Sequence, residues 1–461
     1  MIDTKHLEQF RQIVGEDNVK SDKAHLIAYC YDATKERFEP DAVVFPRDKQ
    51  DVSKVLKYCN DNSIVIVPRG AGSGFTGGSL PSNGGIVLSL ERHMNDLIEI
   101  DMKNMVAVVQ PGLVNMKLQK AAEEVGLFYP PDPASEEYST LGGNVSENAG
   151  GMRAAKYGIT KDYVVALEAV LPNGEIIKAG KKTIKDVAGY NIAGILTASE
   201  GTLAVITEIT LKLIPKPKHK KTYMGIFPDV NSAMNAVFKS LSSGANPVAM
   251  EFLDSLCIKA LKEKLNVDLP SNAGGILVGD VDGSLMDEVD YQLNVLDKSF
   301  KENGAVDFIV AGDDEEANKL WYARRNASPA VTIYGTLKLN EDISVPRANL
   351  PEALDAIYAI GKKYGFQVPC FGHSGDGNIH VNVMVKDKTN EEEVHKGHEC
   401  IKEIFQMVVD MGGTLSGEHG IGLSKAPFMN IAFTDAELEL FKNIKKAFDP
   451  NNILNPFKMG L

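Results

Sequence analysis

The stretch Pro68-Arg-Gly-Ala-Gly-Ser-Gly-Phe-Thr-Gly-Gly-Ser79 places five glycines directly after the apolar run Ile64-Val-Ile-Val67. A buried strand that runs into such a loop lets backbone N–H groups approach an anion, because no Cβ stands in the way. The loop is not a Walker loop, since no Gly-Lys-Ser/Thr follows, and no long helix opens directly from it as a dinucleotide fingerprint requires. The stretch predicts a pyrophosphate cradle, and a flexible surface loop is the alternative.

Two further segments of small residues favour the cradle. Pro130-Pro-Asp-Pro-Ala-Ser135 leads to Ser139-Thr-Leu-Gly-Gly-Asn-Val-Ser-Glu-Asn-Ala-Gly-Gly151, and Ser199-Glu-Gly-Thr-Leu-Ala-Val-Ile-Thr207 comes later. Each segment lies next to a predicted strand. Three such segments suit a long, thin ligand that is threaded through one domain.

Length and composition set the outer limits. A chain of 461 residues is too long for a single hydrophobic core, so two or three domains are expected. The net charge of −13 disfavours nucleic acid and anionic membranes as partners. No window approaches the roughly 20 apolar residues of a membrane span, and MIDTKHLEQF lacks the apolar core of a signal peptide. A local cation or metal must therefore attract any anionic substrate.

The cysteines argue against a cluster held by this chain. None of the five forms a CxxC pair, which disfavours a zinc knuckle and an iron–sulfur cluster. Scattered, reduced cysteines fit the cytosol, so a cytoplasmic chain is expected. The five are Cys30, Cys59, Cys257, Cys370 and Cys400.

Hydrophobic periodicity predicts an α+β fold. A strand at 41–45, a helix at 51–60 and a strand at 64–67 form a β–α–β unit. The Pro- and Lys-rich segment 212–221 predicts the end of the first domain. After it, helices alternate with short strands, as in an antiparallel sheet covered by helices. Other predicted strands are 85–90, 106–110, 164–171, 203–213, 275–279 and 381–385, with helices at 114–124 and 392–411, the last ending at Gly412-Gly413.

The segment His373-Ser-Gly-Asp-Gly-Asn-Ile-His380 predicts a metal-binding hairpin. Asp376-Gly377 favours a two-residue type I′ turn. That turn places His373 opposite His380 with Cβ atoms roughly 5 Å apart, so both imidazoles can reach one ion. Along the second strand, His380, Asn382 and Met384 share the site face, and three valines face the core. Two hydrogen-bonded histidines that merely close a hairpin are the alternative.

Two more segments supply titratable and cationic groups. Ser416-Gly-Glu-His-Gly-Ile-Gly422 holds Glu418, which would complete a set of two histidines and one carboxylate, and His419, which stays free as a base. In Trp321-Tyr-Ala-Arg-Arg-Asn-Ala-Ser328, Arg324 and Ser328 are four apart and would share one face of a helix. The Arg324 fork matches a carboxylate, whereas Arg325 is expected in solvent.

Taken together, these motifs resemble the FAD-linked oxidases of the vanillyl-alcohol oxidase type. Within them the chain is similar to the branch that contains D-lactate dehydrogenase, the flavin subunit of glycolate oxidase and D-2-hydroxyglutarate dehydrogenase. The resemblance runs from Tyr31-Asp32-Ala33 to Asn455-Pro456. It implies a two-part FAD-binding domain at 1–218, an antiparallel-sheet cap domain for substrate and metal at 219–413, and a C-terminal segment at 414–461 that carries the base and returns to the flavin domain.

The resemblance also implies which residues bind FAD. The first loop would hold the pyrophosphate, the middle segment the isoalloxazine and ribityl groups, and the third the body of the cofactor. Some relatives bond the flavin to a His in or near the first loop, but this loop has neither His nor Cys, so FAD is expected to be non-covalent. The implied residues are Pro68, Arg69, Gly70, Ala71, Gly72, Ser73, Gly74, Gly77, Gly78 and Ser79; Pro131, Asp132, Ser135, Gly142, Gly143, Ser146, Asn148 and Gly151; Gly201 and Ile206; and Asn455.

For the second half, the resemblance implies one divalent metal (Zn, Mn or Fe) on His373, His380 and Glu418, with His419 as base. Arg324 would bind the substrate carboxylate, with Ser328 where the family often has Thr and with Asn382 and Lys338 as further substrate contacts. Relatives that accept a second carboxylate carry a Lys slightly further on. Here Lys338 is offset and Asn340 lies close to that place, which weighs against a dicarboxylate.

The motifs and the resemblance together predict a FAD- and metal-dependent dehydrogenase that passes a hydride from a small D-2-hydroxy acid to the flavin N5. D-lactate is the favoured substrate. A glycolate oxidase flavin subunit, a D-2-hydroxyglutarate dehydrogenase, a metal-dependent hydrolase and a flavin-binding electron carrier or structural subunit remain alternatives. The expected electron acceptor is an iron–sulfur subunit, an electron-transfer flavoprotein or a quinone rather than NAD. Such a partner could hold the chain at the inner membrane, and a homodimer stays open.

Overall fold

The structure is a computed structural model that describes residues 2–461. The chain divides into two units. Unit 1 comprises Met1–Gly151, Ile159–Lys216 and Glu418–Leu461, and unit 2 comprises Met152–Gly158 and Pro217–Gly417. Among the described residues, no helix is both long and apolar enough to cross a membrane.

Unit 1 is built on two larger sheets, and a third sheet consists only of the antiparallel pair β7 and β11. The first has the order β1-β2-β4-β3, and its strands β2 and β3 run parallel to β4. The second is antiparallel, with the order β5-β6-β10-β8-β9. The strands of unit 1 are β1 (Val19–Lys20), β2 (Ala42–Val44), β3 (Ile66–Arg69), β4 (Ile86–Ser89), β5 (Leu97–Asp101), β6 (Val106–Val109), β7 (Leu127–Phe128), β8 (Val164–Val170), β9 (Ile176–Gly180), β10 (Val205–Lys212) and β11 (Ile214–Pro215).

Each sheet of unit 1 has its own apolar core. One packs β2, β3 and β4 against α1 and α3, and the other packs β6, β8 and β10 against α4, α5 and α7. The helices of unit 1 are α1 (Thr4–Val14), α2 (Lys23–Tyr29), α3 (Lys49–Asp61), α4 (Asn115–Glu124), α5 (Leu141–Glu147), α7 (Ile192–Leu196), α15 (Met429–Ala432) and α16 (Asp435–Phe448).

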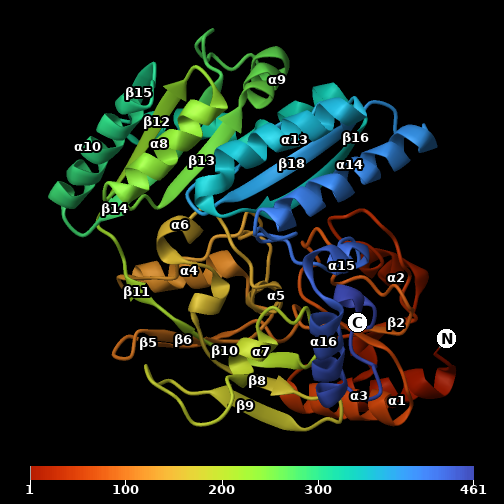
Figure 1. Ribbon diagram of the computed structural model, residues 1–461. Helices are drawn as coiled ribbons and strands as arrows, with labels where there is room; N and C mark the ends of the chain where they lie inside the picture. The colour runs from red at the N-terminus through yellow and green to blue at the C-terminus, as the bar shows by residue number, and fades with distance from the viewer. Residues whose placement is uncertain (1) are drawn as a thin grey trace. The chain divides into compact units, whose positions relative to one another are not determined.

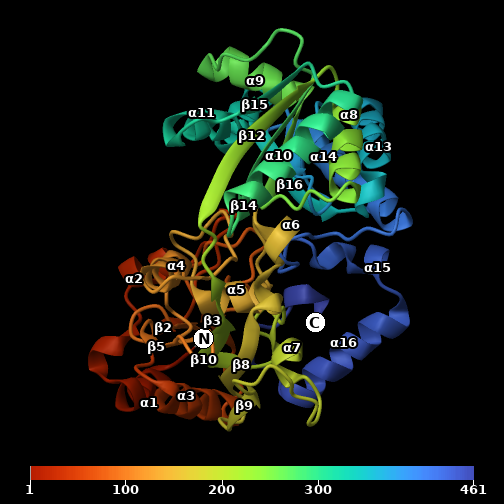
Figure 2. The same ribbon diagram turned by 90° about the vertical axis from the view of Figure 1, so that its left-hand side faces the viewer.

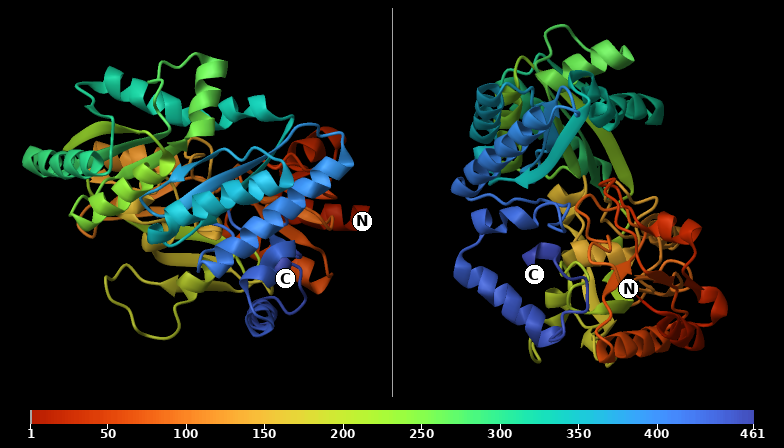
Figure 3. Two further views of the ribbon diagram at one scale, coloured as in Figure 1. Left: turned by 45° about the horizontal axis from the view of Figure 1, so that its top comes forward. Right: turned by 90° about the vertical axis from the view of Figure 1, so that its right-hand side faces the viewer.

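Residues 418–461 of the C-terminal segment belong to unit 1 (Figure 3). The α16 residue Lys445 is buried and donates through Nζ to the carbonyls of Thr202 and Leu454, both at 2.7 Å. Leu454 also forms a parallel bridge to Ile66 at the start of β3. The tail therefore braces the strand that leads into the first glycine loop.

Unit 2 contains one seven-stranded antiparallel sheet with the order β15-β12-β14-β13-β17-β18-β16 (Figure 1). The helices α8, α10, α13 and α14 cover one side, and α9, α11 and α12 lie on the other (Figure 2). The strands are β12 (His219–Phe227), β13 (Ala249–Asp254), β14 (Gly275–Gly283), β15 (Asp307–Val310), β16 (Leu337–Ser344), β17 (Cys370–His373) and β18 (Asn378–Val385). The helices are α6 (Ala154–Tyr157), α8 (Val230–Ser242), α9 (Ser255–Leu265), α10 (Met286–Glu302), α11 (Asp314–Arg325), α12 (Ala327–Ala330), α13 (Leu350–Tyr364) and α14 (Glu391–Asp410).

The elements agree with the periodicity, with small differences at their ends. The last predicted helix is α14, and it ends where Gly412 takes a φ of +77°. The strand predicted at 275–279 extends to Gly283, because it pairs along its whole length with β12. The described cysteines are all buried and unpaired.

Candidate functional site

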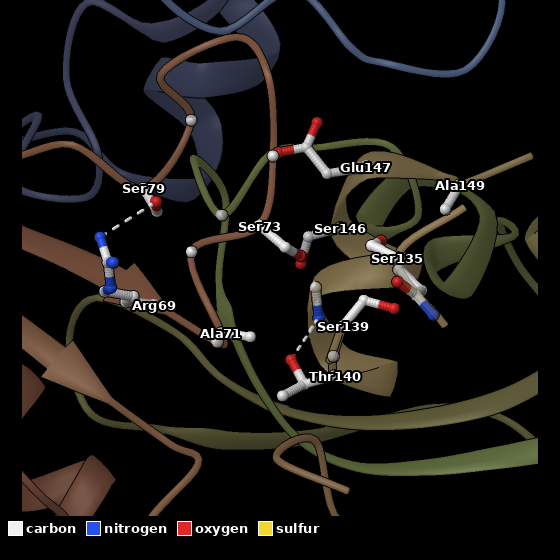
Figure 4. Close-up of a pocket in the computed structure, with 18 of the residues that line it drawn as sticks. Arg69, Ala71, Ser73, Ser79, Ser135, Ser139, Thr140, Ser146, Glu147 and Ala149 are labelled. Carbon is white, nitrogen blue, oxygen red and sulfur yellow. Dashed lines mark hydrogen bonds between the residues drawn. The ribbon is translucent and has the colours of Figure 1, made fainter. Parts of the chain in front are cut away.

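Unit 1 contains a cavity of about 440 Å³ between its three segments of small residues (Figure 4). The loop after β3 forms one wall, and the residues around α5 form another. The start of β10 closes the third side. The predicted cofactor residues that line this cavity are Pro68, Arg69, Gly70, Ala71, Gly72, Ser73, Gly74, Gly78, Ser79, Ser135, Gly142, Gly143, Ser146, Gly201 and Ile206.

Close packing explains two of the glycines, and a third faces the open cavity. A Cβ on Gly70 would lie 2.2 Å from Oγ1 of Thr140, and one on Gly142 would lie 2.6 Å from the Cβ of Pro111. A Cβ on Gly74 would meet nothing within 4 Å. The backbone at Gly74 is therefore exposed to whatever fills the cavity, as a pyrophosphate cradle requires.

Six predicted cofactor residues do not line the cavity: Gly77, Pro131, Asp132, Asn148, Gly151 and Asn455. They support its walls instead. The carbonyl of Pro131 accepts from Asn115 and Gln119, and Gly151 packs on the backbone of Asp132. Asn148 ends α5 in a left-handed conformation and accepts from the N–H of Lys161.

Gly77 and Asn455 support the first loop. Gly77 has a φ of +80° and packs against Leu423. Asn455 donates through Nδ2 to the carbonyls of Gly78 and Glu200 at 2.8 and 2.7 Å. These two residues therefore hold the cradle from outside the cavity.

The sequence reasoning missed two buried carboxyl groups in the cavity wall, Glu147 and Glu200. Glu200 accepts from the N–H groups of Ile421 and Gly422 at 2.7 and 2.8 Å. Burial raises the pKa of both Glu147 and Glu200, and for Glu147 the charge of Glu200 raises it further. Within the described residues, Oε2 of Glu147 has no hydrogen-bond partner, whereas Glu200 accepts from two backbone N–H groups, so Glu147 takes up a proton more readily than Glu200.

Glu418 and His419 line the same cavity as the glycine loops. The His419 ring lies 5.2 Å from the ring of Phe75, and its carbonyl accepts from Oγ1 of Thr76 at 3.3 Å. Glu418 packs beside Gly150, whose Cβ would come within 3.1 Å of the Glu418 side chain. Unit 1 thus brings the predicted base to the predicted flavin cavity.

In unit 2, the predicted register of the histidine hairpin is wrong. Cys370 pairs with Val381 and Phe371 with His380, so residues 374–377 form a four-residue loop in place of the two-residue turn. The hairpin end is held by its neighbour β13, because Oγ of Ser374 and the N–H of Gly375 both donate to the carbonyl of Met250. These two bonds anchor the four-residue loop to β13.

The two histidines nevertheless share one face of the sheet. A register shift of two residues preserves the side on which every side chain lies. His373 and His380 are both buried, their rings are 5.2 Å apart and nearly perpendicular, and their Nε2 atoms are 3.4 Å apart. On the opposite face, Val385 lies against Gly397 of α14, so the valines do face the core.

A buried glutamate that the sequence reasoning missed connects this pair to a cation. Glu251 of β13 lies opposite His373 in the sheet, and its Oε1 is 2.7 Å from Nδ1 of His373. Its Oε2 lies 2.8 Å from Nε of Arg324. Arg324 also stacks over the ring of Phe371, 4.9 Å from its centre. A lone carboxylate in the apolar run Val248–Leu253 was the signal available in the sequence.

The prediction that Arg324 and Ser328 lie on one continuous helix is wrong. The helix α11 ends at Arg325, and α12 begins at Ala327 after a break at Asn326. Pro329 has no N–H to donate to the carbonyl of Arg325, so the ladder is interrupted there. Ser328 instead accepts a hydrogen bond of 2.6 Å from Nζ of Lys338 on β16.

Asn382 is fully buried, and its amide is held within the sheet. Its Nδ2 donates to the carbonyls of Pro369 and His380, and its Oδ1 accepts from Asn340. These bonds brace β16 and β18 and leave the amide few free positions, so we assign Asn382 a supporting role.

Asp342 anchors the segment that leads to Glu418. It lies opposite His380 in the sheet. Its Oδ2 accepts from Oγ of Ser416 at 3.1 Å and from the N–H of Gly417 at 3.0 Å. Gly417 is the last residue of unit 2, and Glu418 is bonded directly to it.

A cofactor-sized, glycine-lined cavity in one unit and a cluster of imidazoles, carboxylate and guanidinium on an antiparallel sheet in the other define a two-unit α+β oxidoreductase of the flavin-linked type. Residues 40–180 match the family model "FAD binding domain", and residues 216–459 match "FAD linked oxidases, C-terminal domain". The chain therefore belongs to the FAD-linked oxidases, which confirms the family expected from the motifs.

The fold class is also confirmed. The structure of p-cresol methylhydroxylase with substrate bound resembles this chain with a TM-score of 0.80 at 20% identity, covering 99% of this chain and 96% of that chain. That likeness shows the vanillyl-alcohol oxidase type of FAD-binding fold with a second domain built on a large antiparallel sheet.

Several relatives match along nearly their whole length. Glycolate oxidase subunit GlcD of Bacillus subtilis is 40% identical, covering 98% of this chain and 96% of the relative. D-lactate dehydrogenase of Anaerostipes hadrus is 32% identical, covering 99% and 96%. D-2-hydroxyglutarate dehydrogenase of Stutzerimonas stutzeri is 30% identical, covering 100% and 99%. A metal-dependent hydrolase is set aside, because it leaves both the family and the glycine segments unexplained.

Proposed function

We propose that this protein oxidises a small 2-hydroxy acid, glycolate or D-lactate, to the 2-oxo acid with FAD as the oxidant. The observation that carries the proposal is the pair of imidazoles and the guanidinium of Arg324 joined by Glu251 on one buried sheet face. The imidazoles can bind a metal cation, and the guanidinium can donate hydrogen bonds to a carboxylate. A 2-hydroxy acid carries a hydroxyl group for the first and a carboxylate for the second. The names of the relatives support the same substrate class.

The residues fit a divalent metal. Two nitrogen ligands at 2.0–2.1 Å in tetrahedral geometry stand about 3.3 Å apart, and the Nε2 atoms of His373 and His380 are 3.4 Å apart. We propose Glu418 as the third ligand, in keeping with the ligand types these three residues offer. This proposal is supported by the position of Glu418 in the chain. Glu418 directly follows Gly417, whose N–H donates a hydrogen bond to Asp342, and Asp342 lies opposite His380 in the sheet.

Each residue of the proposed site has a separate role in the reaction. Arg324 would hold the substrate carboxylate through guanidinium N–H groups that Glu251 does not use. A divalent ion on the proposed ligands would polarise the substrate hydroxyl and lower its pKa. His419, which lines the cofactor cavity, would take the hydroxyl proton. Bound FAD would accept the two electrons as a hydride from the substrate Cα.

FAD is proposed to be non-covalent, because the first loop, 68–79, contains neither His nor Cys. The electrons would then pass to a partner protein or a quinone. The most similar relative named above is itself called a subunit, which supports a partner protein. An iron–sulfur subunit or an electron-transfer flavoprotein fits that need.

Whether the site accepts a substrate with a second carboxylate depends on Lys338. Its Nζ lies at Ser328, only a few residues beyond Arg324 in the chain. A monocarboxylate needs Arg324 alone, and an unpaired buried second carboxylate costs several kcal/mol. We therefore propose a monocarboxylate. A dicarboxylate would need Lys338 to leave Ser328 and pair with the second carboxylate.

The test is anaerobic bleaching of the flavin by glycolate, D-lactate, L-lactate and D-2-hydroxyglutarate. We expect glycolate and D-lactate to bleach it fastest. L-lactate should be far slower, because the metal, Arg324 and the flavin would fix three points around the substrate Cα and so select one hand. If D-2-hydroxyglutarate is fastest, Lys338→Ala should remove that preference, and the monocarboxylate proposal is wrong. If none of these acids bleaches the flavin, the proposed function fails.

A further inference from the structure

The strand β13 carries two fully buried carboxyl groups, Glu251 and Asp254, on opposite faces of the sheet. A buried charge is tolerated only when it is paired and hydrogen-bonded. Asp254 meets this need as a helix cap, since it accepts from the N–H of Cys257 and Cys370 and from the hydroxyl of Tyr358. The partners of Glu251 are of a different kind.

Each oxygen of Glu251 holds a different functional side chain. Oε1 lies 2.7 Å from Nδ1 of His373. Oε2 lies 2.8 Å from both Nε and Nη2 of Arg324. The pairing of β13 with β17 places Glu251 directly opposite His373, so the sheet fixes this contact. One rigid carboxylate therefore sets the relative position of an imidazole and a guanidinium.

The contact with His373 fixes which ring nitrogen faces the other histidine. An ionised Glu251 can only accept, so Nδ1 of His373 must donate the proton. In the neutral imidazole Nε2 is then the nitrogen without a proton, and it lies 3.4 Å from Nε2 of His380. A carboxylate behind a histidine holds the ring and its tautomer ready for a metal.

The contact with Arg324 fixes the direction of the remaining donors. Glu251 occupies the Nε side of the fork, and the ring of Phe371 covers one face at 4.9 Å. The N–H groups of Nη1 and the second N–H of Nη2 make no hydrogen bond to another described residue, so they can receive an anion. The Arg324 side chain is only 12% exposed, so it has little room to turn elsewhere.

We propose that Glu251 is a positioning residue that couples the metal ligand His373 to the substrate clamp Arg324. This inference rests on the proposed function, and it adds a residue that neither the motifs nor the relatives' names point to. Because one side chain serves both partners, a change at Glu251 weakens metal binding and substrate binding together.

The test substitutes Glu251→Gln. The amide oxygen can accept from one partner, but the amide NH₂ then faces the N–H of the other. Zn²⁺ titrated into metal-free, FAD-loaded protein by calorimetry should bind about 10- to 100-fold more weakly, the usual effect of losing such a carboxylate. The KM for glycolate or D-lactate should rise at least several-fold at saturating Zn²⁺, because Arg324 is no longer held.

Asp254→Asn is the matched control, since Asp254 lies on the same strand with the same burial. It should lower the melting temperature but leave the Zn²⁺ affinity and KM within twofold. Should Glu251→Gln not fold, Glu251→Asp keeps the charge and shortens the side chain, so it cannot reach both partners. It should then weaken Zn²⁺ binding or raise KM by at least threefold.

The outcomes separate this inference from the proposed function. If the folded Glu251 variants bind Zn²⁺ and substrate within twofold of the unaltered protein, Glu251 is merely structural and the inference is wrong. The same conclusion follows if Asp254→Asn weakens both as much as Glu251→Gln does. If the unaltered protein binds no Zn²⁺ and no 2-hydroxy acid reduces it, the proposed function itself has failed and the inference falls with it.

Discussion

Unit 1 and unit 2 make their sites in opposite ways. The cavity of unit 1 is lined largely by glycines and small side chains, and its shape depends on the absence of Cβ atoms at positions such as Gly70 and Gly142. The site face of unit 2 depends on buried charged groups, with Glu251 between His373 and Arg324. One unit leaves room for a ligand, and the other holds a set of buried, paired charges.

This difference predicts how each unit responds to substitution. Unit 1 should be sensitive to atoms that are added, because they occupy the space of the cofactor or of a neighbouring backbone. Unit 2 should be sensitive to charges that are removed, because the partner is left buried and unpaired. The predictions below run from the largest expected effect to the smallest.

Removing a proposed metal ligand should have the largest effect. His380→Ala is expected to slow flavin reduction by about a thousandfold, since the ion contributes several kcal/mol at the transition state. FAD should stay bound, because its cavity is in unit 1. The measurement is stopped-flow bleaching together with flavin content, and His398→Ala, on the exposed side of α14, is the control. A loss of FAD along with activity would show that the two units are not independent.

Removing the proposed base should cost less. His419→Ala is expected to slow flavin reduction by about a hundredfold, near the lower end for a general base. Because His419 is not one of the three proposed metal ligands, His373, His380 and Glu418, Zn²⁺ affinity should not change. Bleaching at the normal rate in this variant would exclude His419 as the base.

Adding one methyl group to the cofactor loop should act on FAD alone. A Cβ at Gly74 meets no protein atom within 4 Å, so the folded chain should accept Gly74→Ala. With FAD in the cavity the methyl group should clash, and the FAD dissociation constant should rise by about tenfold, as for modest overpacking. The cofactor-free variant should melt at an unchanged temperature. Unaltered FAD affinity would mean that the cofactor does not reach this loop.

The two glutamates in the cavity wall, Glu147 and Glu200, should differ slightly when they are substituted. Burial raises the pKa of Glu147 and so favours its neutral form, and Glu147→Gln puts a neutral amide of similar shape there, so activity should be nearly unchanged. Glu200→Gln loses one of two bonds to the backbone of Ile421 and Gly422. It should slow flavin reduction by about threefold through the neighbouring His419. Equal effects of the two variants would contradict this assignment.

The same difference explains what could be predicted from the sequence. The glycine segments are continuous stretches, so their position beside strands and around a cavity follows from local pattern. The hairpin register was missed because it is set by bonds to Met250 on another strand. Glu251 was missed because its partner His373 is 122 residues away. Local chemistry is readable in a sequence, whereas strand pairing across the chain is not.

The prediction of one continuous helix from Arg324 to Ser328 was wrong for a related reason. The spacing of Arg324 and Ser328 fits a helix, but Pro329 interrupts the ladder, and the hydroxyl of Ser328 is bound by Lys338 from a distant strand. Spacing predicted that both residues belong to the site region, and only the fold determines what each one contacts.

The most direct test of the central claim is removal and return of the metal in FAD-loaded protein. Divalent ions are stripped with a chelator, glycolate or D-lactate is added without oxygen, and Zn²⁺, Mn²⁺ or Fe²⁺ is then supplied while the flavin spectrum is followed. The account predicts that the stripped protein keeps its yellow flavin, that the acid leaves it oxidised, and that one of the ions restores bleaching. Bleaching at full rate in the stripped protein would contradict the claim that a metal takes part in the reduction of the flavin.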